Sequence, residues 1–543
     1  MSVAVKQPTE IEAKFAVVDP SVLETLARER SPVAGYRFGP VARKVVRDVY
    51  LDTADYRLLR HGYQVRVRTG IDGSVMTLKG SGAANEVGIY QRVEIEESFG
   101  GEQLPESIAD MPPSLAGALG GVLDARAKLA PICVIEQTRR VRDIAAEAPG
   151  RTRGRAPTLA ILSLDEMRIR QSREGAVIAR AYEVEVELKP GVDAAELHVL
   201  ADRFLGAFEL TPSTESKLAR SLAIISRHPL ASPENWQGVQ PSMHMAEACR
   251  VIWQEQFMQM LLNEAGVRHA SDPEHVHDAR VAIRRARAAA RIHEEYFKPK
   301  ATRRYLKRLR RTARLLGAVR DLDVAIGKLQ EYRQKNRRKW TGDLQTKLDE
   351  WLAKRASAHG ELVAWLDNKK YAAFVADFVR FCRTPGAGIV HFESKPGDEV
   401  IPFQVRHVTP TMLLSNFERV RSFETCFEQA DAVPVETLHR LRIACKYLRY
   451  NLEFVANLLG PQAGEIIESL RNLQDDLGDL NDAAVSKQLL AGGESVDGEA
   501  ATTSYERTQD RIIEKLRRQM RRDFAGFVSP ANRARIFSAI ANL

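Results

Sequence analysis

Four short segments in the first half of the chain alternate between apolar and charged residues. A period of two is typical of a β-strand, because successive side chains of a strand point to opposite faces. The pattern therefore predicts a front region built mainly from strands, with helices at 20–30, 113–129 and 193–206 and a Gly/Pro/Arg loop at 143–158. The four alternating segments are 9–16, 63–68, 90–97 and 181–188.

The charged positions of these strands are sorted by sign. Glu183, Glu185 and Glu187 share one face of their strand, and Arg66 and Arg68 share one face of another. For any single strand, a charged face turned toward water is the plainer interpretation. Rows of carboxylates and rows of arginines in the same region favour the polar interior of a closed barrel.

From about residue 243 onward, apolar residues recur at steps of three and four, which is typical of amphipathic helices. A proline-rich segment, 228–241, separates this region from the strands and is predicted to be a linker. The sequence thus predicts two domains, an α+β domain at 1–227 and an all-α domain at 242–543.

A pattern of basic residues, H-x2-R-x3-[R/K]-x2-R, starts at His277 and again 162 residues later at His439. On a helix these positions fall within an arc of roughly 80°. The recurrence predicts two helical repeats, at about 243–380 and 405–543, each with a cationic stripe. The stripes continue through Arg280, Arg284 and Arg287 in the first copy and through Arg442, Lys446 and Arg449 in the second.

The charge of the chain is unevenly distributed. Residues 1–240 carry 31 basic and 32 acidic side chains, whereas residues 241–543 carry 49 and 39. A solvated face is the alternative for one Arg-rich helix, but it explains a repeated stripe less well. The cationic part is expected to attract an anionic polymer. Few aromatic residues accompany these cations, which argues against a specific nucleic acid.

The five cysteines are scattered and form no C-x-x-C pair, so neither a disulfide framework nor a thiolate zinc site is predicted. The first residues lack the apolar core of a signal peptide. No window approaches the ~18 apolar residues of a membrane span. We therefore expect a cytoplasmic protein that does not enter a membrane.

Carboxylates in the strand region have the spacing that a metal site requires. Glu10 and Glu12 point the same way from one strand, and Glu183 and Glu185 do so from a late strand. If these strands meet, four carboxylates converge and offer the hard oxygen ligands that Mg²⁺ or Mn²⁺ prefers. Cations must accompany them, because buried unpaired carboxylates are costly. The available cations are Lys14, Arg66, Arg68, Lys79, Arg92, Arg139 and Lys217.

Six motifs in the front region resemble the CYTH superfamily, the triphosphate tunnel metalloenzymes. The resemblance covers about residues 8–225 and implies an eight-stranded antiparallel barrel that binds a triphosphate together with a divalent metal. The motifs are E-x-E-x-K (10–14), RDVYLDT (47–53), YQVRVR (63–68), TLKG (77–80), YQRVEIE (90–96) and YEVEVELKPG (182–191).

The resemblance also implies roles for residues in the predicted barrel. Glu10, Glu12 and Lys14 would be catalytic, and the metal ligands would be Glu10, Glu12, Glu183 and Glu185. The triphosphate would be held by Arg66, Arg68, Lys79, Arg92, Lys217 and either Arg139 or Arg140. Glu94 and Glu96 resemble a further acidic pair. Glu187 is expected to lie too near the strand end to reach the metal, and Tyr50 and Asp52 are expected to be structural residues in a turn. No P-loop motif is present, so side chains would hold the phosphates.

The helical region resembles the CHAD domain, a pair of pseudo-symmetric helical bundles that binds inorganic polyphosphate. The motifs are VHDARVAIRRARAAARI (276–292), LLGAVRDLDV (315–324), LHRLRIACKYLRYNLE (438–453) and LQDDLGDLNDA (473–483). Asp321 and Asp482 are expected to orient arginines or cap helices. His277 and His439 are either contacts or buried packing residues. The polyphosphate contacts that the resemblance implies are His277, Arg280, Arg284, Arg287, Arg310, Arg314, Arg442, Lys446, Arg449 and Arg471.

The main hypothesis is a metal-dependent inorganic triphosphatase coupled to a polyphosphate-binding module. Its substrate would be tripolyphosphate or a related phosphoanhydride, and the protein would associate with polyphosphate granules. Two alternatives remain open. The first is a non-catalytic polyphosphate-binding protein, and the second is nucleotide cyclisation, since the superfamily includes adenylate cyclases.

Overall fold

The computed structural model describes the chain in nine stretches, and its contacts divide the chain into two compact units. The first unit comprises Met1–Trp236 with Leu261–His269, and the second comprises Gln237–Met260 with Ala270–Leu543. Each unit is described by itself below. The described residues are 9–80, 88–100, 103–147, 157–228, 238–270, 272–392, 400–429, 433–491 and 499–543.

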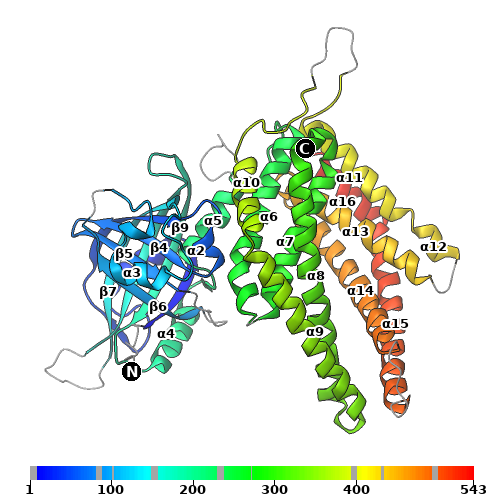
Figure 1. Ribbon diagram of the computed structural model, residues 1–543, viewed down its shortest axis with the longest axis horizontal. Helices are drawn as coiled ribbons and strands as arrows, with labels where there is room; N and C mark the ends of the chain where they lie inside the picture. Colours follow the sequence, from blue (N-terminus) through cyan, green and yellow to red (C-terminus); the bar gives the residue numbers. More distant parts are fainter. Residues whose placement is uncertain are drawn as a thin grey trace. The chain divides into compact units, whose positions relative to one another are not determined.

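The first unit contains an antiparallel β-sheet (Figure 1). Its long strands carry the alternating pattern that the sequence shows. The described strands are β1 (Thr9–Val17), β2 (Tyr36–Phe38), β3 (Ala42–Asp52), β4 (Gln64–Gly70), β5 (Gly73–Lys79), β6 (Ile89–Ser98), β7 (Ala130–Ala146), β8 (Thr158–Arg170), β9 (Val177–Leu188) and β10 (Leu210–Pro212).

Eight of the described strands close into a barrel in the order β1-β6-β5-β4-β3-β7-β8-β9. The closure is made by β1, which pairs with β6 through its first half and with β9 through its second half. In the β1–β9 pair, Lys14 lies opposite Glu185. The short strands β2 and β10 add to β7 and β1. The predicted eight-stranded antiparallel barrel is confirmed.

The two faces of the barrel wall have opposite character. Ala13, Phe15 and Val17 of β1 point outward and are buried beneath the helices α1 and α4. Elsewhere α3 covers the outward apolar residues of β3, β4 and β5. The charged residues between them therefore point into the barrel, as the sorting of charges along the strands indicated. The helices of this unit are α1 (Ser21–Arg28), α2 (Arg57–Arg60), α3 (Pro113–Leu119), α4 (Ala194–Ala207) and α5 (Lys217–Arg227).

Two helices are fixed at their first turns by side chains. Asp52 accepts hydrogen bonds from the backbone N–H groups of Leu58 and Leu59, both at 2.9 Å, and so holds the start of α2. Ser216 caps α5 by accepting from the backbone of Ala219 at 3.1 Å. Because α5 begins at Lys217, this cap also fixes the position of that lysine.

Two predicted boundaries in this unit are wrong. The helix predicted at 113–129 ends at Leu119, because Gly120 and Gly121 follow and glycine disfavours continuation of a helix. Residues 143–146 of the predicted loop belong to β7. The part of that loop at 148–156 lies outside the described residues, as does most of the predicted linker.

Helices make up the region after the barrel, which confirms the all-α prediction (Figure 1). Among the described helices, none has the length and hydropathy needed to cross a membrane. They are α6 (Met245–His269), α7 (Pro273–Ile292), α8 (Pro299–Lys335), α9 (Gly342–Leu366), α10 (Lys369–Cys382), α11 (Val405–Arg421), α12 (Glu424–Gln429), α13 (Val435–Phe454), α14 (Gln462–Ala491), α15 (Glu499–Val528) and α16 (Pro530–Ile540).

The long helices of this region pack as antiparallel hairpins. In Figure 1, α8 lies beside α9, and α14 lies beside α15. The two cationic stripes lie on α7 and α13, which contact each other. The helix α7 is capped by Asp272, whose carboxylate accepts from the backbone of Glu274 at 2.8 Å. Its apolar face, including Ile283 and Ala286, is buried.

Candidate active site and basic groove

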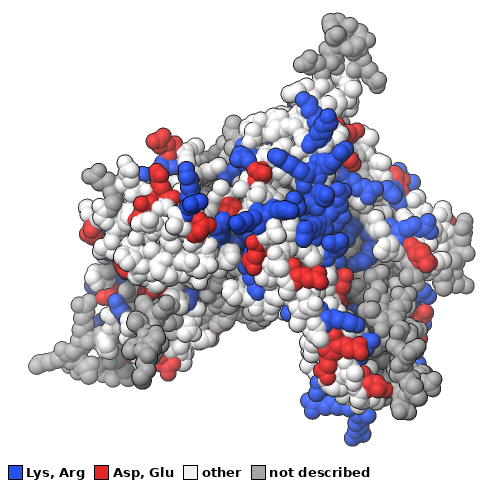
Figure 2. All heavy atoms as spheres, viewed as in Figure 1, with Lys and Arg blue, Asp and Glu red and all other residues white. Residues whose placement is uncertain are grey.

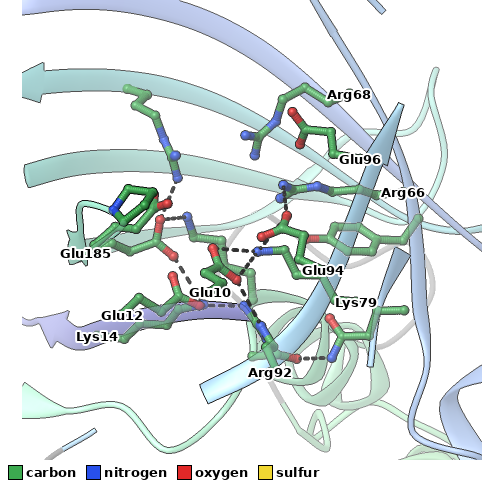
Figure 3. Close-up of a pocket in the computed structure, with 17 residues that line it drawn as sticks. Glu10, Glu12, Lys14, Arg66, Arg68, Lys79, Arg92, Glu94, Glu96 and Glu185 are labelled. Atoms are coloured by element: carbon green, nitrogen blue, oxygen red, sulfur yellow. Dashed lines mark hydrogen bonds and ion pairs between the residues drawn. The ribbon is translucent and has the colours of Figure 1, made fainter. Parts of the chain in front are cut away.

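The barrel encloses a cavity of about 490 Å³ whose wall is almost entirely charged or polar (Figure 3). The side chains come from most of the strands and from the start of α5. The cavity is lined by Glu10, Glu12, Lys14, Tyr50, Gln64, Arg66, Arg68, Lys79, Arg92, Glu94, Glu96, Arg139, Glu185, Glu187, Pro190, Ser216 and Lys217.

The register of β1 against its neighbours sets the centre of this site. Glu10 lies opposite Arg92 on β6. The Arg92 guanidinium donates to the carboxylates of Glu10 at 3.2 Å and Glu12 at 2.6 Å. On the other side, the Lys14 ammonium lies 2.9 Å from Glu12 and 3.2 Å from Glu185. Glu12 and Lys14 are both buried, so each depends on these partners for its charge.

Lys79 connects two carboxylates of neighbouring strands. Its ammonium lies 2.8 Å from Glu10 and 3.1 Å from Glu94. Burial disfavours the charge of Glu10, but Lys79 and Arg92 outweigh burial and lower its pKa to about 2. Burial, followed by the charge of Glu10, makes Glu94 harder to ionise despite Lys79, and the pKa of Glu94 is raised. The carboxylates of Glu10 and Glu94 therefore lie close together around Lys79.

The opposite wall contains two buried carboxylates that the sequence analysis missed. Asp165 on β8 accepts two hydrogen bonds from Arg139, at 2.8 and 2.7 Å, and forms an ion pair with Lys217. Asp48 on β3 accepts two from Arg68, at 2.7 and 2.8 Å. Both aspartates are fully buried. Asp165 thus fixes the positions of Arg139 and Lys217, and Asp48 fixes that of Arg68; all three cations are candidates for binding phosphate.

The other expectations for this wall have mixed outcomes. Of the two neighbouring arginines, Arg139 lines the cavity, whereas Arg140 pairs with Glu24 at 2.7 Å. Tyr50 was expected in a turn, but it lies within β3 and lines the cavity. Asp52 holds the start of α2, as described above.

The three glutamates of β9 lie at different depths along the barrel. Glu183 is fully buried, does not line the cavity, and pairs with Arg220 at 3.1 Å. Glu187 does line the cavity and lies opposite Glu12 in the β1–β9 register. Burial, followed by the charges of Glu10 and Glu12, raises the pKa of Glu187 to about 7. Glu185 and Glu187 are therefore the β9 carboxylates that face the lumen.

Asp165, Glu183 and Glu185 also form a close acidic group, with candidate ligand atoms within 4.8 Å of one another. The Lys217 ammonium already contacts all three, at 3.5 Å from Glu183 and 3.1 Å from Glu185. The chain itself thus supplies the positive charge there. On the lumen side, a divalent cation could be held where Glu187 faces Glu12; there burial, followed by the charges of Glu10 and Glu12, raises the pKa of Glu187.

The helical region has a cationic cavity of about 520 Å³ between α7, α8 and α13. Figure 2 shows Lys and Arg side chains gathered over this part of the helical unit. The cavity is lined by Arg284, Arg287, Ala288, Ala290, Arg291, Glu294, Leu306, Arg310, Ile443, Lys446, Tyr447 and Tyr450. We call it the basic groove; it joins residues of both stripes.

The remaining predicted contacts lie outside the lining of this groove. Arg280 pairs with Asp321 at 3.2 Å, a contact of the kind expected if that aspartate orients an arginine. Arg449 donates to Gln474 at 3.0 Å and to Glu453 at 3.1 Å. The same lining omits Arg314, Arg442, Arg471 and the two histidines of the stripes.

The two histidines differ in exposure. His439 is exposed, so a buried packing role is wrong for it. His277 is half-buried, and burial together with Arg320 lowers its pKa. The side chain of Asp482 lies outside the described residues.

The chain thus combines a barrel whose lumen is lined by cations and carboxylates with a helical region that contains a cationic groove. Comparison with family models agrees. The CYTH domain matches residues 8–222, and the CHAD domain matches residues 251–491. The chain is therefore a protein in which a CYTH domain is followed by a CHAD domain.

Solved structures resemble each part of the chain. HpAC1 from Hippeastrum, described as having a dominant triphosphatase activity, is 21% identical with a TM-score of 0.29, over 39% of this chain and 93% of that one. The CHAD domain from Ricinus communis is 20% identical with a TM-score of 0.36, over 58% and 98%. PptA from Streptomyces chartreusis is 15% identical with a TM-score of 0.38, over 52% and 97%. Among curated proteins no match is found.

Proposed function

We propose that the CYTH domain is a metal-dependent triphosphatase that hydrolyses inorganic tripolyphosphate or a related phosphoanhydride, and that the CHAD domain binds polyphosphate. The CYTH match supports an enzyme that acts on triphosphates. The observation that carries the proposal is the lumen, in which cations and carboxylates face one cavity of about 490 Å³. This is the chemistry that a phosphate chain with a divalent cation requires.

The cations of the lumen would hold the phosphate oxygens. Arg66, Arg68 and Arg139 present guanidinium groups that match phosphate geometry, and Lys79 and Arg92 add two further charges. Apart from the aliphatic stems of charged residues, Tyr50 and Pro190 supply the apolar part of the described lining. With Tyr50 as the single aromatic residue of the described lining, little is available for a nucleobase to stack on, which favours an inorganic chain over a nucleoside, and so hydrolysis over cyclisation.

The residues that would hold the metal are Glu10, Glu12, Glu185 and Glu187. Glu183 remains a predicted ligand, but its depth and its pairing with Arg220 favour Glu187 in its place. A bound Mg²⁺ or Mn²⁺ would supply Lewis acidity toward the phosphate oxygens and an oriented water. These carboxylates would fix its position beside the cations that hold the chain.

Lys14 would act through its charge and not by proton transfer. Burial disfavours its ammonium form, but Glu12 and Glu185 outweigh burial and raise the pKa of Lys14 above its ordinary value. The ammonium therefore stays protonated at physiological pH. Its contacts of 2.9 Å and 3.2 Å hold Glu12 and Glu185 together, and charge developing on the phosphate would be stabilised by a preorganised cation.

In the CHAD domain, Arg284, Arg287, Arg291, Arg310 and Lys446 line the basic groove. Five cations on one cavity wall attract a polyanion, and release of its counterions favours binding. Binding of this kind would also place the protein at polyphosphate granules in the cytoplasm.

The test is release of phosphate by the full-length chain. Tripolyphosphate, ATP, thiamine triphosphate and long-chain polyphosphate are incubated with Mg²⁺, with Mn²⁺ or with EDTA, and phosphate and cyclic AMP are measured. We expect release from tripolyphosphate with either metal and none with EDTA. No turnover of any of these substrates would favour the non-catalytic alternative, and cyclic AMP from ATP would favour the cyclase.

A further inference from the structure

Lys446 is the one lysine in the two copies of the repeated basic pattern. The corresponding residue of the first copy is Arg284, and each of the other non-histidine positions is also arginine. An arginine keeps its charge at every physiological pH, whereas a lysine can lose its proton when its surroundings disfavour the charge. The pattern therefore places a single titratable amine among groups that do not titrate.

The surroundings of Lys446 disfavour its charge. It is half-buried and lines the basic groove. From α7, Arg280 and Arg284 act on its ammonium, and from its own helix α13, Arg442 and Arg449 do so.

The other charged groups of this region are Arg287, Arg291, Glu294 and Arg310 on the groove and the Glu453 carboxylate. Glu453 is engaged by Arg285 at 3.0 Å and Arg449 at 3.1 Å. Among the described residues, no carboxylate forms an ion pair with Lys446.

Burial, and then the four arginine charges, lower the pKa of Lys446 to about 7. A phosphate chain in the groove would place negative charge beside Lys446 and these arginines, and so offset the repulsion that the arginines exert on its ammonium group. The ammonium form would then be favoured again.

We propose that polyphosphate binding to the basic groove is coupled to uptake of a proton by Lys446. This inference rests on the proposed polyphosphate-binding function of the CHAD domain. In the free groove a fraction of the Lys446 side chains is neutral near neutral pH, and in the complex the side chain is charged.

The sign of the pH dependence follows from linkage. Well below pH 7, Lys446 is charged in both states, so its contribution to binding is then complete. At higher pH the free groove loses the proton that the complex keeps. Affinity then falls with rising pH, by at most about tenfold per pH unit for one coupled proton.

The experiment is calorimetric titration of the full-length chain with long-chain polyphosphate, in EDTA to prevent turnover. Long chains are used because their end groups, which titrate near neutral pH, are few. Two buffers with different heats of ionisation at pH 7.5 give the number of protons taken up. We expect roughly three quarters of a proton per groove, from a free pKa near 7.

Three variants isolate Lys446. Lys446→Arg keeps the charge but cannot titrate. It should still bind polyphosphate, but without the proton uptake of Lys446, and its affinity should depend less on pH between pH 6 and 8.5. Arg284→Lys places a second titratable amine in the groove and should increase the uptake. Lys335→Arg, on an exposed lysine paired with Glu331, should behave as wild type.

The possible outcomes separate two failures. If wild type and Lys446→Arg bind with the same proton uptake, the coupling to Lys446 is overturned while polyphosphate binding stands. If wild type does not bind long-chain polyphosphate at any pH, the proposed function of the groove is overturned, and the coupling with it.

Discussion

The guanidinium of Arg280 packs over Gly317 of the neighbouring helix α8, and a Cβ at Gly317 would lie 3.7 Å from its Nε. The second repeat contains the same pair, since a Cβ at Gly478 would lie 3.6 Å from Nη2 of Arg442. Gly317 and Gly478 are therefore part of the same structural unit as the basic stripe of each repeat. The glycine leaves room for an arginine to cross the adjacent helix.

Substitutions at Gly317 should separate stability from binding. At 3.7 Å a methyl group fits, so Gly317→Ala should raise the free energy of unfolding by about 0.5–1 kcal/mol without weakening polyphosphate binding. Gly317→Leu should displace Arg280 and weaken binding although no charge is removed. Gly327, also within α8, has open space around it and is the matched control. If Gly317→Leu and Gly327→Leu bind polyphosphate equally well, the packing of Arg280 over Gly317 does not matter for binding.

Removing the charge of two proposed metal ligands should abolish metal-dependent turnover. Glu10→Gln/Glu12→Gln keeps the side-chain shape, and phosphate release from tripolyphosphate in Mg²⁺ should fall by at least about 100-fold. Glu166→Gln provides the control, because Glu166 is more than a third exposed and its ion pair with Arg180 spans 3.9 Å. Full turnover by the folded double variant would show that the ligand assignment is wrong.

The cations of the lumen should bind phosphate in the absence of metal. Each of Arg66→Ala, Arg68→Ala and Lys79→Ala removes a charge-assisted contact of about 1.5–3 kcal/mol, so each should weaken tripolyphosphate binding roughly tenfold or more. Calorimetry in EDTA measures this affinity directly. Arg140→Ala, which removes a cation paired with Glu24, should leave it unchanged. Unchanged affinity in all three lumen variants would exclude binding in the lumen.

Polyphosphate binding by the basic groove should depend steeply on salt. The variant Arg280→Ala/Arg284→Ala/Arg287→Ala should bind more weakly and with a smaller slope of log affinity against log salt, because fewer counterions are released. Lys335→Ala/Arg337→Ala/Arg338→Ala removes the same charge at the last residue of α8 and in the turn that follows it, and is the control. Equal salt slopes in the two triple variants, or stronger binding of RNA than of polyphosphate, would contradict the assignment.

His293 should make the helical domain sensitive to acid. It is buried at the end of α7, where Nδ1 lies 2.8 Å from the carbonyl oxygen of Ala289, and burial lowers its pKa to about 4. The unfolded chain binds a proton near pH 6.5 and the folded chain does not, so stability is lost as pH falls below 6.5. Between pH 7 and pH 5 this contribution is about 2 kcal/mol. Urea unfolding of His293→Gln should show a flatter pH dependence; an unchanged slope would contradict it.

The sequence alone predicts which side chains of each strand point into the barrel. Glu10, Glu12 and Lys14 face the lumen because their alternation with apolar neighbours fixes their side of the strand. Arg66 and Lys79 face it for the same reason. The orientation of a side chain on a strand is a local property, and a single segment of sequence contains it.

The position of each side chain along the barrel axis could not be predicted from the sequence. Glu183, Glu185 and Glu187 have the same parity, and the pairing of Glu12 with Glu187 decides which of them reach the cavity. That register depends on hydrogen bonds between strands far apart in the sequence. The same holds for Asp165, whose partner Arg139 lies on another strand. Locally, Asp165 is only one of several charged residues on β8 and directly precedes Glu166, so nothing in that segment marks its role.

The closure of the barrel by β1 and β9 bears on the order in which the protein is made. Lys14 emerges from the ribosome early, but its partner Glu185 and the cation Lys217 follow much later. Until then the acidic and basic side chains of β1 remain hydrated in the nascent chain, because the last strands that would bury them do not yet exist. Contacts of such long sequence separation form slowly. A truncated translation product that ends before β9 would therefore contain the E-x-E-x-K motif but lack the partners that complete the lumen.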